Sequence, residues 1–431
     1  MAVEEKQFSL GLNLDDYWYE ARHCDGQNHC RWIDLNYVTG FDFAWRCPPW
    51  QKEGFTVYGA AGKCHLVDHL LKGQLDYTDP ALRDIVYECM LCGGCDAGCK
   101  RNMDYEIQLM LESLRARLVG KGNGPMPQHV PITNNIENNR NYYGLDQRHR
   151  QDWVPQDVKV TAGADTLFFA GCRASFVDNE IAVATARILN AANADFMMMN
   201  DEPCCGHFVF ITGQVEKARK IAEDNLKAIR ETGARTVVFS CAEGYKAVKV
   251  DYPKLLGLST ADLGFEVKHI TELVSEWVSE GKLKLVNPIN MKLTYHDPCN
   301  LGRLAEPWIP WEGTRSTNFS RLTPPREMRR GIYGIYEPPR DILKTIPGIE
   351  LVEMVRHHES AWPSGHDGGV KEAFPDLASW TATERLREAA SIGAEAIVSC
   401  CPGCKEIFTE NSKDGMKVYD ITELIATAIG K

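Results

Sequence analysis

Residues 233–246 have the sequence GARTVVFSCAEGYK, and residues 393–406 repeat its pattern as GAEAIVSCCPGCKE. The match places Cys241 opposite Cys401, and it places a glycine of the first segment opposite Cys404. Each segment contains a short apolar run that is typical of a buried strand, and the run ends at a loop that carries cysteine. The repeat therefore predicts two related lobes, each with a strand that delivers a cysteine at its carboxyl end.

The repeat extends to both sides of these segments. Helical periodicity precedes them at 215–232 and at 377–392, and the matching stretches KHITELVSEWV and YDITELIATAI follow them. Further upstream, the predicted strands 164–172 and 291–299 each end at a cysteine. Strands that alternate with helices favour α/β lobes with parallel sheets, in which ligands bind at the carboxyl ends of the strands.

Composition places the chain among ordinary globular proteins. It has 431 residues, of which 44% are hydrophobic and 25% charged, and this excludes collagen-like, fibrous and disordered classes. The formal charge of -11 gives no overall attraction to phosphate backbones, so we expect no nucleic-acid partner. No apolar run approaches the roughly 20 residues that span a bilayer, and the first residues lack a secretory signal, so we expect a cytoplasmic protein without a membrane span.

Sixteen cysteines are the outstanding feature of the sequence. A reducing cytosol does not favour disulfides, and a chain of this length does not need them, so metal binding is the leading explanation. The cysteines form two sets of eight. The first set is Cys24, Cys30, Cys47, Cys64, Cys89, Cys92, Cys95 and Cys99, and the second is Cys172, Cys204, Cys205, Cys241, Cys299, Cys400, Cys401 and Cys404.

The first set ends in the run Cys89-x2-Cys92-x2-Cys95-x3-Cys99. This spacing wraps a 4Fe-4S cubane, and the fourth cysteine of such a run usually reaches a neighbouring cluster. A zinc site needs only four ligands and normally separates two CxxC pairs by a longer loop, so zinc is the weaker interpretation. Lys100 departs from the pattern, because ferredoxin-type runs usually carry proline after the fourth cysteine.

The other cysteines of the first set are spaced too widely for a second copy of the run, although Cys47-Pro48 resembles a displaced fourth ligand. Eight thiols suffice for two cubanes. We therefore expect the first three cysteines of the run to share a cluster with one earlier cysteine, and Cys99 to cross over to the second cluster. The alternative is one cubane with a structural zinc or with free thiols. The expected 4Fe-4S ligands are Cys89, Cys92, Cys95, Cys99, Cys24, Cys30, Cys47 and Cys64.

In the second set, a lone Cys172 precedes the sequence Pro-Cys-Cys-Gly at 203–206, and a strand-borne Cys241 follows. This pattern and its partial repetition between Cys299 and Cys404 resemble the CCG cysteine-rich domain. That domain is known from heterodisulfide reductase catalytic subunits, anaerobic glycerol-3-phosphate dehydrogenase, lactate-utilisation proteins and sulfite-reductase-associated membrane complexes. A 4Fe-4S domain, a linker and two lobes follow the same order as in the fused heterodisulfide reductase subunit, so the resemblance covers nearly the whole chain.

These patterns predict a multidomain α+β and α/β fold, in which a helical ferredoxin-like 4Fe-4S domain precedes two pseudo-symmetric α/β CCG lobes. A stretch rich in asparagine, glycine and proline, without a sustained apolar period, is interpreted as a surface linker between them. The expected boundaries are 1–120 for the ferredoxin-type domain, 121–160 for the linker, 161–288 for the first lobe and 289–431 for the second lobe, with an insertion at 302–338.

The resemblance implies that each lobe is able to hold a noncubane iron-sulfur cluster through five cysteines. The first lobe departs from this pattern, because Gly244 stands where the family has its last cysteine. Four thiolates still suffice for a cluster of cubane or modified noncubane type, and zinc is the main competitor. His207 follows the Cys-Cys-Gly directly. It either orients a substrate thiol or tunes the cluster, and the alternative is a structural role. The expected ligands of this third cluster are Cys172, Cys204, Cys205 and Cys241.

The second lobe has Pro363-Ser364 in place of the family's Cys-Cys pair, in an alignment fixed by Arg356 and by Gly368-Gly369. Histidine or aspartate would complete a cluster or zinc site there. The alternative is a decayed lobe whose cysteines are merely buried. The candidate metal ligands are Cys299, Cys400, Cys401 and Cys404, with His296, Asp297, His357, His358 or His366 completing the set.

The sequence has no dinucleotide-binding, phosphate-loop or nucleophile-elbow motif. We therefore expect electrons to come from and go to other subunits of a redox complex, which contain flavin and iron-sulfur clusters. The insertion carries Trp308, Trp311 and a basic patch within 326–330, and it is either a docking surface or a solvated loop. The aromatic segment LNLDDYWYEA at 12–21 either clamps a partner or belongs to the core.

The function we expect is that of an iron-sulfur electron-transfer subunit in an anaerobic oxidoreductase complex. The resemblance further implies that the corresponding subunit of a class II benzoyl-CoA reductase complex is a possible equivalent. One alternative is a catalytic subunit that reduces a heterodisulfide or protein disulfide, although the missing family ligands argue against it. The other is a zinc-bearing scaffold subunit. No catalytic residue is assigned from the sequence.

Overall fold

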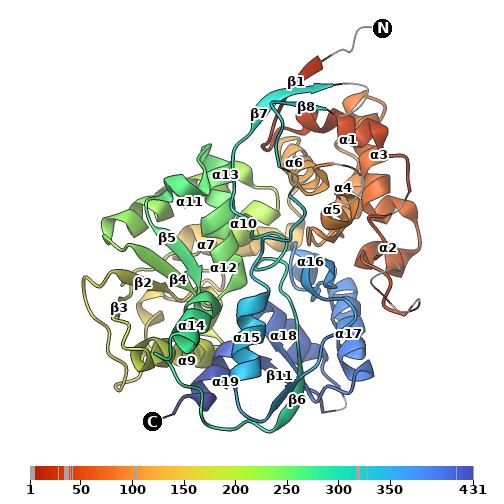
Figure 1. Cartoon of the computed structure of the whole chain (residues 1–431). Helices are drawn as coiled ribbons and strands as arrows, with labels where there is room; N and C mark the ends of the chain where they lie inside the picture. The colour runs from red at the N-terminus through yellow and green to blue at the C-terminus, as the bar shows by residue number, and fades with distance from the viewer. Residues whose placement is uncertain are drawn as a thin grey trace.

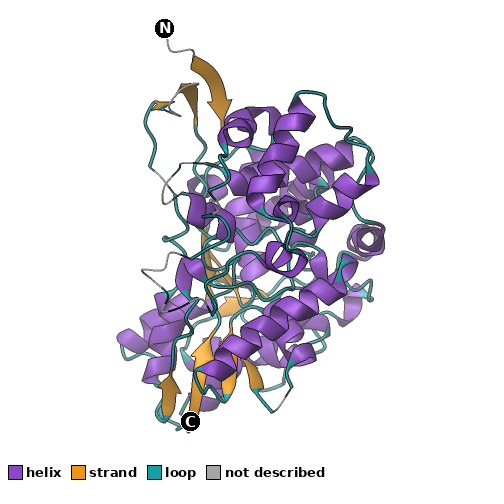
Figure 2. Ribbon diagram, turned by 90° about the vertical axis from the view of Figure 1, so that its right-hand side faces the viewer, coloured by secondary structure: helices purple, strands orange, loops and turns teal. Residues whose placement is uncertain are grey.

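A computed structural model describes residues 5–27, 29–33, 38, 40, 42–100, 103, 105–316, 321–327, 329–413 and 415–430. It contains a helical amino-terminal region and two α/β lobes, each built on a parallel sheet (Figure 1). The expected α/β architecture with two parallel sheets is confirmed. In Figure 2 most strands gather in the lower half of the molecule, and helices cover them.

The two sheets have the same strand order. The first lobe is ordered β3-β2-β4-β5 and the second β9-β6-β10-β11, with all neighbours parallel. This equivalence confirms the repeat found in the sequence. The strands are β2 (Thr166–Phe169), β3 (Phe196–Met197), β4 (Thr236–Phe239), β5 (Glu266–His269), β6 (Met291–Tyr295), β9 (Ile349–Leu351), β10 (Ala396–Ser399) and β11 (Lys417–Asp420).

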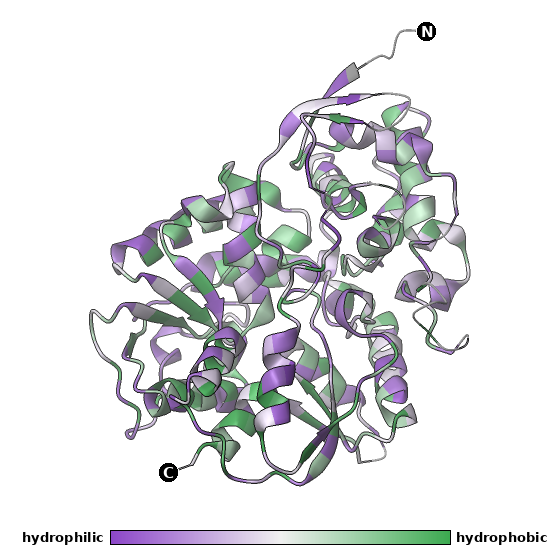
Figure 3. Ribbon diagram, in the orientation of Figure 1, coloured by the Kyte–Doolittle hydropathy of each residue, from purple (hydrophilic) through white to green (hydrophobic). Residues whose placement is uncertain are grey.

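Apolar runs place the central strands in the core. The strands β2, β4 and β10 are almost wholly buried, as expected for parallel strands that are covered on both faces. Figure 3 shows hydrophobic residues along the strands of both parallel sheets. The covering helices of the first lobe are α8 (Cys172–Phe176), α9 (Asn179–Ala191), α10 (His207–Ile211), α11 (Val215–Glu231), α12 (Ala242–Lys246), α13 (Tyr252–Leu256) and α14 (Ile270–Ser279).

The lobes pack against each other with the same pseudo-symmetry. Helix α9 of the first lobe contacts α19 of the second, and α14 contacts α15. In each pair, the helix after the first strand of one lobe meets the last helix of the other. The helices of the second lobe are α15 (Glu337–Thr345), α16 (Val370–Ala373), α17 (Pro375–Ser391), α18 (Pro402–Asn411) and α19 (Ile421–Ala428).

The amino-terminal region is helical, and it continues into the predicted linker. Helix α7 lies within 121–160, where we expected no regular element. Its sequence buries only Thr133 and Ile136, so the apolar period is too sparse to be recognised. The helices of this region are α1 (Trp18–His23), α2 (Pro48–Glu53), α3 (Ala60–Leu71), α4 (Pro80–Tyr87), α5 (Gly94–Cys99), α6 (Ile107–Gly120) and α7 (Val130–Asn139).

The insertion at 302–338 is joined to the start of the chain by a small antiparallel sheet. Strand β7 (Glu312–Ser316) pairs with β1 (Glu5–Ser9) on one side and with β8 (Leu322–Thr323) on the other. Figure 1 shows this sheet above the helical region, far from the two parallel sheets. Leu14, Tyr17 and Tyr19 of the aromatic segment are buried, so that segment belongs to the core.

Candidate cofactor sites

Four cysteines of the amino-terminal region line a cavity of about 40 Å³. Cys24 follows α1, Cys64 lies in α3 and Cys99 ends α5, so three helices converge on the cavity, and Cys30 completes the group. A hydrogen bond from Cys64 lowers the pKa of Cys24 to about 6, whereas burial raises the pKa of Cys30. The cavity is thus surrounded by thiols, one of which readily becomes a thiolate. We refer to Cys24, Cys30, Cys64 and Cys99 as group A.

The other four thiols of this region form a second group. Cys47 interacts electrostatically with Cys89 and Cys92, and so does Cys95. Burial raises the pKa of Cys47 to about 12. Between Cys92 and Cys95 the backbone is left-handed at Gly93. A Cβ there would lie 2.5 Å from the Leu304 side chain, so the position favours glycine. We refer to Cys47, Cys89, Cys92 and Cys95 as group B.

The thiols of the first lobe line a cavity of about 200 Å³. Cys172 and Cys241 follow the adjacent strands β2 and β4, which places both at the carboxyl edge of the sheet. Cys204 and Cys205 precede α10, and Cys172 hydrogen bonds to Cys204. Residues of the second lobe also line this cavity. We refer to Cys172, Cys204, Cys205 and Cys241 as group C.

A buried ion pair lies beside Cys172 of group C. Arg150 and Glu202 are 2.7 Å apart, and a second guanidinium hydrogen bond reaches the Cys172 sulfur at 3.8 Å. Glu202 also accepts hydrogen bonds from the backbone amides of Ala170 and Gly171, at 2.8 and 2.9 Å. These contacts fix the loop that carries Cys172. No sequence pattern pointed to these contacts, although Glu202 directly precedes the Pro-Cys-Cys-Gly.

Two histidines occupy equivalent positions on the walls of the same cavity. His207 follows the Cys-Cys-Gly of the first lobe, and His366 follows the Pro-Ser-Gly that replaces it in the second. His207 lies 3.1 Å from Asp367. His366 lies between two carboxylates, 3.3 Å from Glu243 and 3.2 Å from Glu406.

These carboxylates keep both imidazoles protonated. Burial alone would lower the pKa of His207, but Asp367 and Asp251 together outweigh it and raise that pKa to about 9. Burial likewise opposes protonation of His366, and the two glutamates raise its pKa well above the usual value. The cavity therefore presents thiols from one lobe and imidazolium groups from both.

The four candidate ligands of the second lobe lie in three different environments. Cys400 is buried against Tyr295, with its sulfur 2.8 Å from the hydroxyl oxygen. Cys299 points toward the amino-terminal region, where it hydrogen bonds to Cys92. Cys401 and Cys404 hydrogen bond to each other.

The residues proposed to complete that site are also dispersed. His296 lies beside Cys404, and Asp297 is held by Arg340 at 2.7 and 2.9 Å. His357 and His358 contact each other, with 2.6 Å between their Nδ1 atoms. Among the residues that the structure describes, no group of three or more His, Cys, Asp or Glu side chains is arranged to hold a single metal ion.

Parts of the described insertion contact the body of the protein. Arg326 pairs with the buried Glu106 of the body, whereas Arg329 pairs at 3.1 Å with Glu306, which belongs to the insertion itself. The backbone amide of Trp308 donates to Thr260 at 2.7 Å. The aromatic and basic residues that suggested a docking surface are thus largely engaged within the chain.

No helix of the described residues is long and apolar enough to cross a bilayer.

Comparison with known proteins gives consistent matches. The family model of the cysteine-rich domain CCG matches residues 166–245 and 326–409. The chain is 36% identical over 388 residues to one subunit of the dihydromethanophenazine:CoB--CoM heterodisulfide reductase of Methanosarcina mazei, covering 88% of this chain and 86% of that protein. It is 27% identical over 382 residues to the probable iron-sulfur-binding oxidoreductase FadF of Bacillus subtilis, with 82% and 49% covered. The EtfAB:quinone oxidoreductase of Syntrophomonas wolfei is 26% identical over 373 residues, with 80% and 47% covered.

Proposed function

The chain belongs to the cysteine-rich CCG family of heterodisulfide reductase-like iron-sulfur oxidoreductase subunits, and on this premise we propose that it relays electrons within a larger redox complex. Its partners in this proposal are other subunits that carry flavin and iron-sulfur clusters. The cysteine thiols that converging helices and strands bring together in groups A, B and C support the proposal.

Groups A and B each have the donor set of a 4Fe-4S cluster. Four cysteine thiolates ligate such a cluster, and in two-cluster ferredoxins the fourth cysteine of the run ligates the other cluster. The placement of Cys99 in group A and of Cys89, Cys92 and Cys95 in group B is in keeping with this crossover. When bound, the clusters would supply one-electron transfer.

Group C has four thiols and an adjacent cavity, so it fits a third iron-sulfur cluster. The Arg150 guanidinium donates to the Cys172 sulfur at 3.8 Å, so it offsets thiolate charge there. Hydrogen bonds and charge near the sulfurs tune the potential of such a centre.

The contact between Cys92 and Cys299 is the observation that carries the proposal. It joins group B directly to the second lobe, and Arg303 covers both cysteines. The guanidinium lies 3.2 Å from the Cys299 sulfur and also donates to the backbone carbonyl of Cys92. The thiols of Cys92 and Cys299 are therefore neighbours across the boundary between the amino-terminal region and the second lobe. Such proximity between cysteines of different regions is what an electron relay requires.

A serine variant of group C tests the assignment. We expect Cys205→Ser to remove one electron paramagnetic resonance signal from the anaerobically reduced protein and to leave the signals of groups A and B. Cys400→Ser is the matched control, since Cys400 is outside all three groups. Retention of every signal in Cys205→Ser would overturn the assignment of a cluster to group C.

Disulfide reduction is the second candidate, favoured by the cavity in which thiols face two imidazolium groups. Protonated histidines are suitable proton donors for a departing thiolate. The absence of cysteine at Gly244, Pro363 and Ser364 weighs against it. Turnover of a small heterodisulfide with a reduced viologen dye distinguishes this activity from electron relay alone.

A further inference from the structure

The sequence Cys401-Pro402-Gly403-Cys404 joins a buried parallel strand to a helix. Strand β10 ends at Ser399, and α18 begins at Pro402, so Cys401 is the residue directly before the helix. A CxxC sequence between a strand and a helix is typical of dithiol redox sites. Residues three positions apart lie on the same side of a helical turn, so the Cys404 thiol lies close to the Cys401 thiol. The two thiols hydrogen bond to each other.

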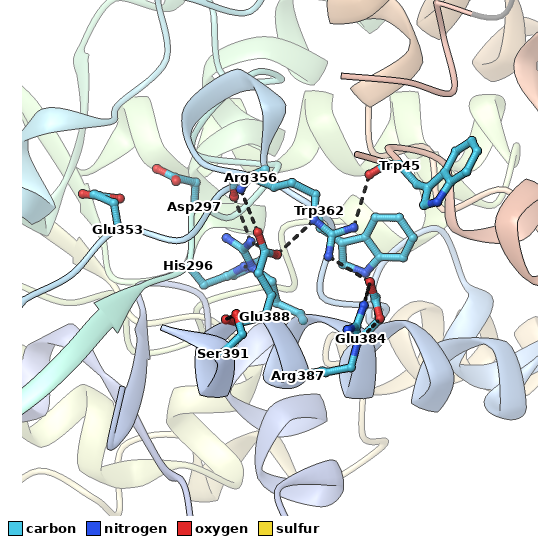
Figure 4. Close-up of polar contacts among 12 residues, drawn as sticks. Trp45, His296, Asp297, Glu353, Arg356, Trp362, Glu384, Arg387, Glu388 and Ser391 are labelled. Atoms are coloured by element: carbon cyan, nitrogen blue, oxygen red, sulfur yellow. Dashed lines mark hydrogen bonds and ion pairs between the residues drawn. The ribbon is translucent and has the colours of Figure 1, made fainter. Parts of the chain in front are cut away.

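Polar groups surround Cys404 although the site is buried. Its sulfur lies 3.2 Å from the Ser364 hydroxyl oxygen, and His296 lies beside it. His296 accepts a hydrogen bond at Nδ1 from Arg385 at 3.1 Å, so the proton of the neutral imidazole is on Nε2. Glu388 holds Arg385 at 2.6 Å and is itself bound by Arg356, as Figure 4 shows for Arg356 and Glu388. The surroundings therefore suit a sulfur that changes its charge.

The pair lies between group B and group C. On one side, Cys404 interacts electrostatically with Cys299, which hydrogen bonds to Cys92 of group B. On the other side, the Cys401 sulfur is 3.8 Å from Glu243 and interacts electrostatically with Cys241 of group C. Both thiols are buried, at 2% and 6% exposure, so the pair is internal to the protein.

We propose that Cys401 and Cys404 form a redox-active dithiol-disulfide pair that stores two electrons between group B and group C. This inference rests on the proposed function, since it takes the reductant to be a one-electron donor of the iron-sulfur class. It also gives the second lobe a role that needs no metal. The serine at 364, where the family has cysteine, serves in this account as a hydrogen-bond partner of the pair.

The chemistry balances with two electrons and two protons. Reduction breaks the S–S bond between the two sulfurs, and two one-electron transfers supply the electrons. One proton ends on the Cys401 sulfur and one on the Cys404 sulfur, which gives two thiols. Oxidation reverses each step: the thiols lose two protons, the two electrons leave, and the S–S bond forms.

Differential alkylation tests the proposal on the anaerobic holoprotein. One sample is oxidised with a mild one-electron dye and another is reduced with excess reduced methyl viologen. Both are quenched in acid, unfolded and alkylated. Trypsin then releases the peptide 388–405, which contains Cys400, Cys401 and Cys404. We expect one alkylated cysteine in the oxidised peptide and three in the reduced peptide, as measured by mass spectrometry.

Three alkylated cysteines in both samples would overturn the proposal. So would loss of iron or zinc in Cys401→Ser and Cys404→Ser but not in the neighbouring Cys400→Ser, because the pair would then be metal ligands. Dithiothreitol reduces a disulfide without any cluster. If only dithiothreitol reduced the Cys401–Cys404 disulfide, the proposal that iron-sulfur donors supply its electrons would be overturned. Absence of iron from the wild-type protein would instead contradict the proposed function.

Discussion

Arg150 and Glu202 have side chains that are only 2% and 4% exposed, and their charges compensate each other beside Cys172. Sequence patterns did not single out either residue. Arg150 lies in the asparagine- and arginine-rich linker, and a buried ion pair between distant segments leaves no local period. The grouping of the four cysteines of group C, in contrast, was expected, because Cys172 and Cys241 end predicted strands and the Pro-Cys-Cys-Gly pattern resembles the CCG domain. Residues that position the ligands became visible only in the folded structure.

Removing one partner of this pair should destabilise the first lobe. In Glu202→Gln the Arg150 charge remains buried without compensation, which costs about 3–5 kcal/mol. We expect a lower denaturant midpoint in anaerobic unfolding. Glu223→Gln, at an exposed position of α11, should stay within about 0.5 kcal/mol of the wild type. Equal midpoints for both variants would show that the pair does not support the loop of Cys172.

His207 should make stability depend on pH. Its pKa is raised to about 9 in the folded protein from an ordinary value near 6.5, so the native state binds the proton more tightly. The stabilisation is fully present below about pH 6.5 and is lost as pH rises through about 9. We expect the stability difference between wild type and His207→Gln to follow this curve in denaturation measurements. A difference independent of pH from 6 to 10 would contradict the charged pair with Asp367.

At the scale of elements, the strands that carry cysteines were predictable and the small antiparallel sheet was not. The runs that became β2, β4 and β10 are apolar and short, which identifies buried strands from local sequence. Strands β1 and β7 have the polar sequences EKQFS and EGTRS, and they pair across some 300 residues. Neither strand shows a two-residue apolar period, so only tertiary contacts define them.

Phe8 should hold the insertion to the body of the protein. Its ring is 5.5 Å from that of Trp311 and 4.0 Å from the Arg315 guanidinium, and the residue is 2% exposed. Phe8→Ala removes these contacts at a cost of about 3–5 kcal/mol. We expect faster hydrogen exchange at the amides of β7. Phe55→Ala, at a residue 70% exposed, is the control, and unchanged exchange in Phe8→Ala would show that β1 does not anchor the insertion.

At the scale of the whole molecule, Arg115 of α6 connects all three regions. Its guanidinium donates to the backbone carbonyls of Ile211 in the first lobe and Gly368 in the second, each at 2.7 Å, and to that of Cys89. The side chain is completely buried. Arg115 therefore contributes directly to the relative placement of group B and the two lobes, beside the Arg303 contact between Cys92 and the second lobe.

Arg115→Leu should weaken this junction. Each buried carbonyl left without a donor costs about 1–3 kcal/mol, so the total loss should exceed about 3 kcal/mol. Arg117→Leu, two residues further along α6, breaks a partly exposed pair with Asp15 and a contact with the Tyr77 ring, and it should cost less than about 1 kcal/mol. Anaerobic chemical denaturation compares the two variants. A loss in Arg115→Leu no larger than in Arg117→Leu would mean that the junction is held by other contacts.

We propose three iron-sulfur centres for this chain, one in each of groups A, B and C. The number of irons, acid-labile sulfides and zinc ions per chain, measured in protein purified without air, tests this proposal. With a four-iron cluster in group C, we expect about twelve irons with matching sulfide and no stoichiometric zinc. About eight irons with one zinc would contradict the assignment of group C, and a protein that holds zinc without iron would contradict the electron relay altogether.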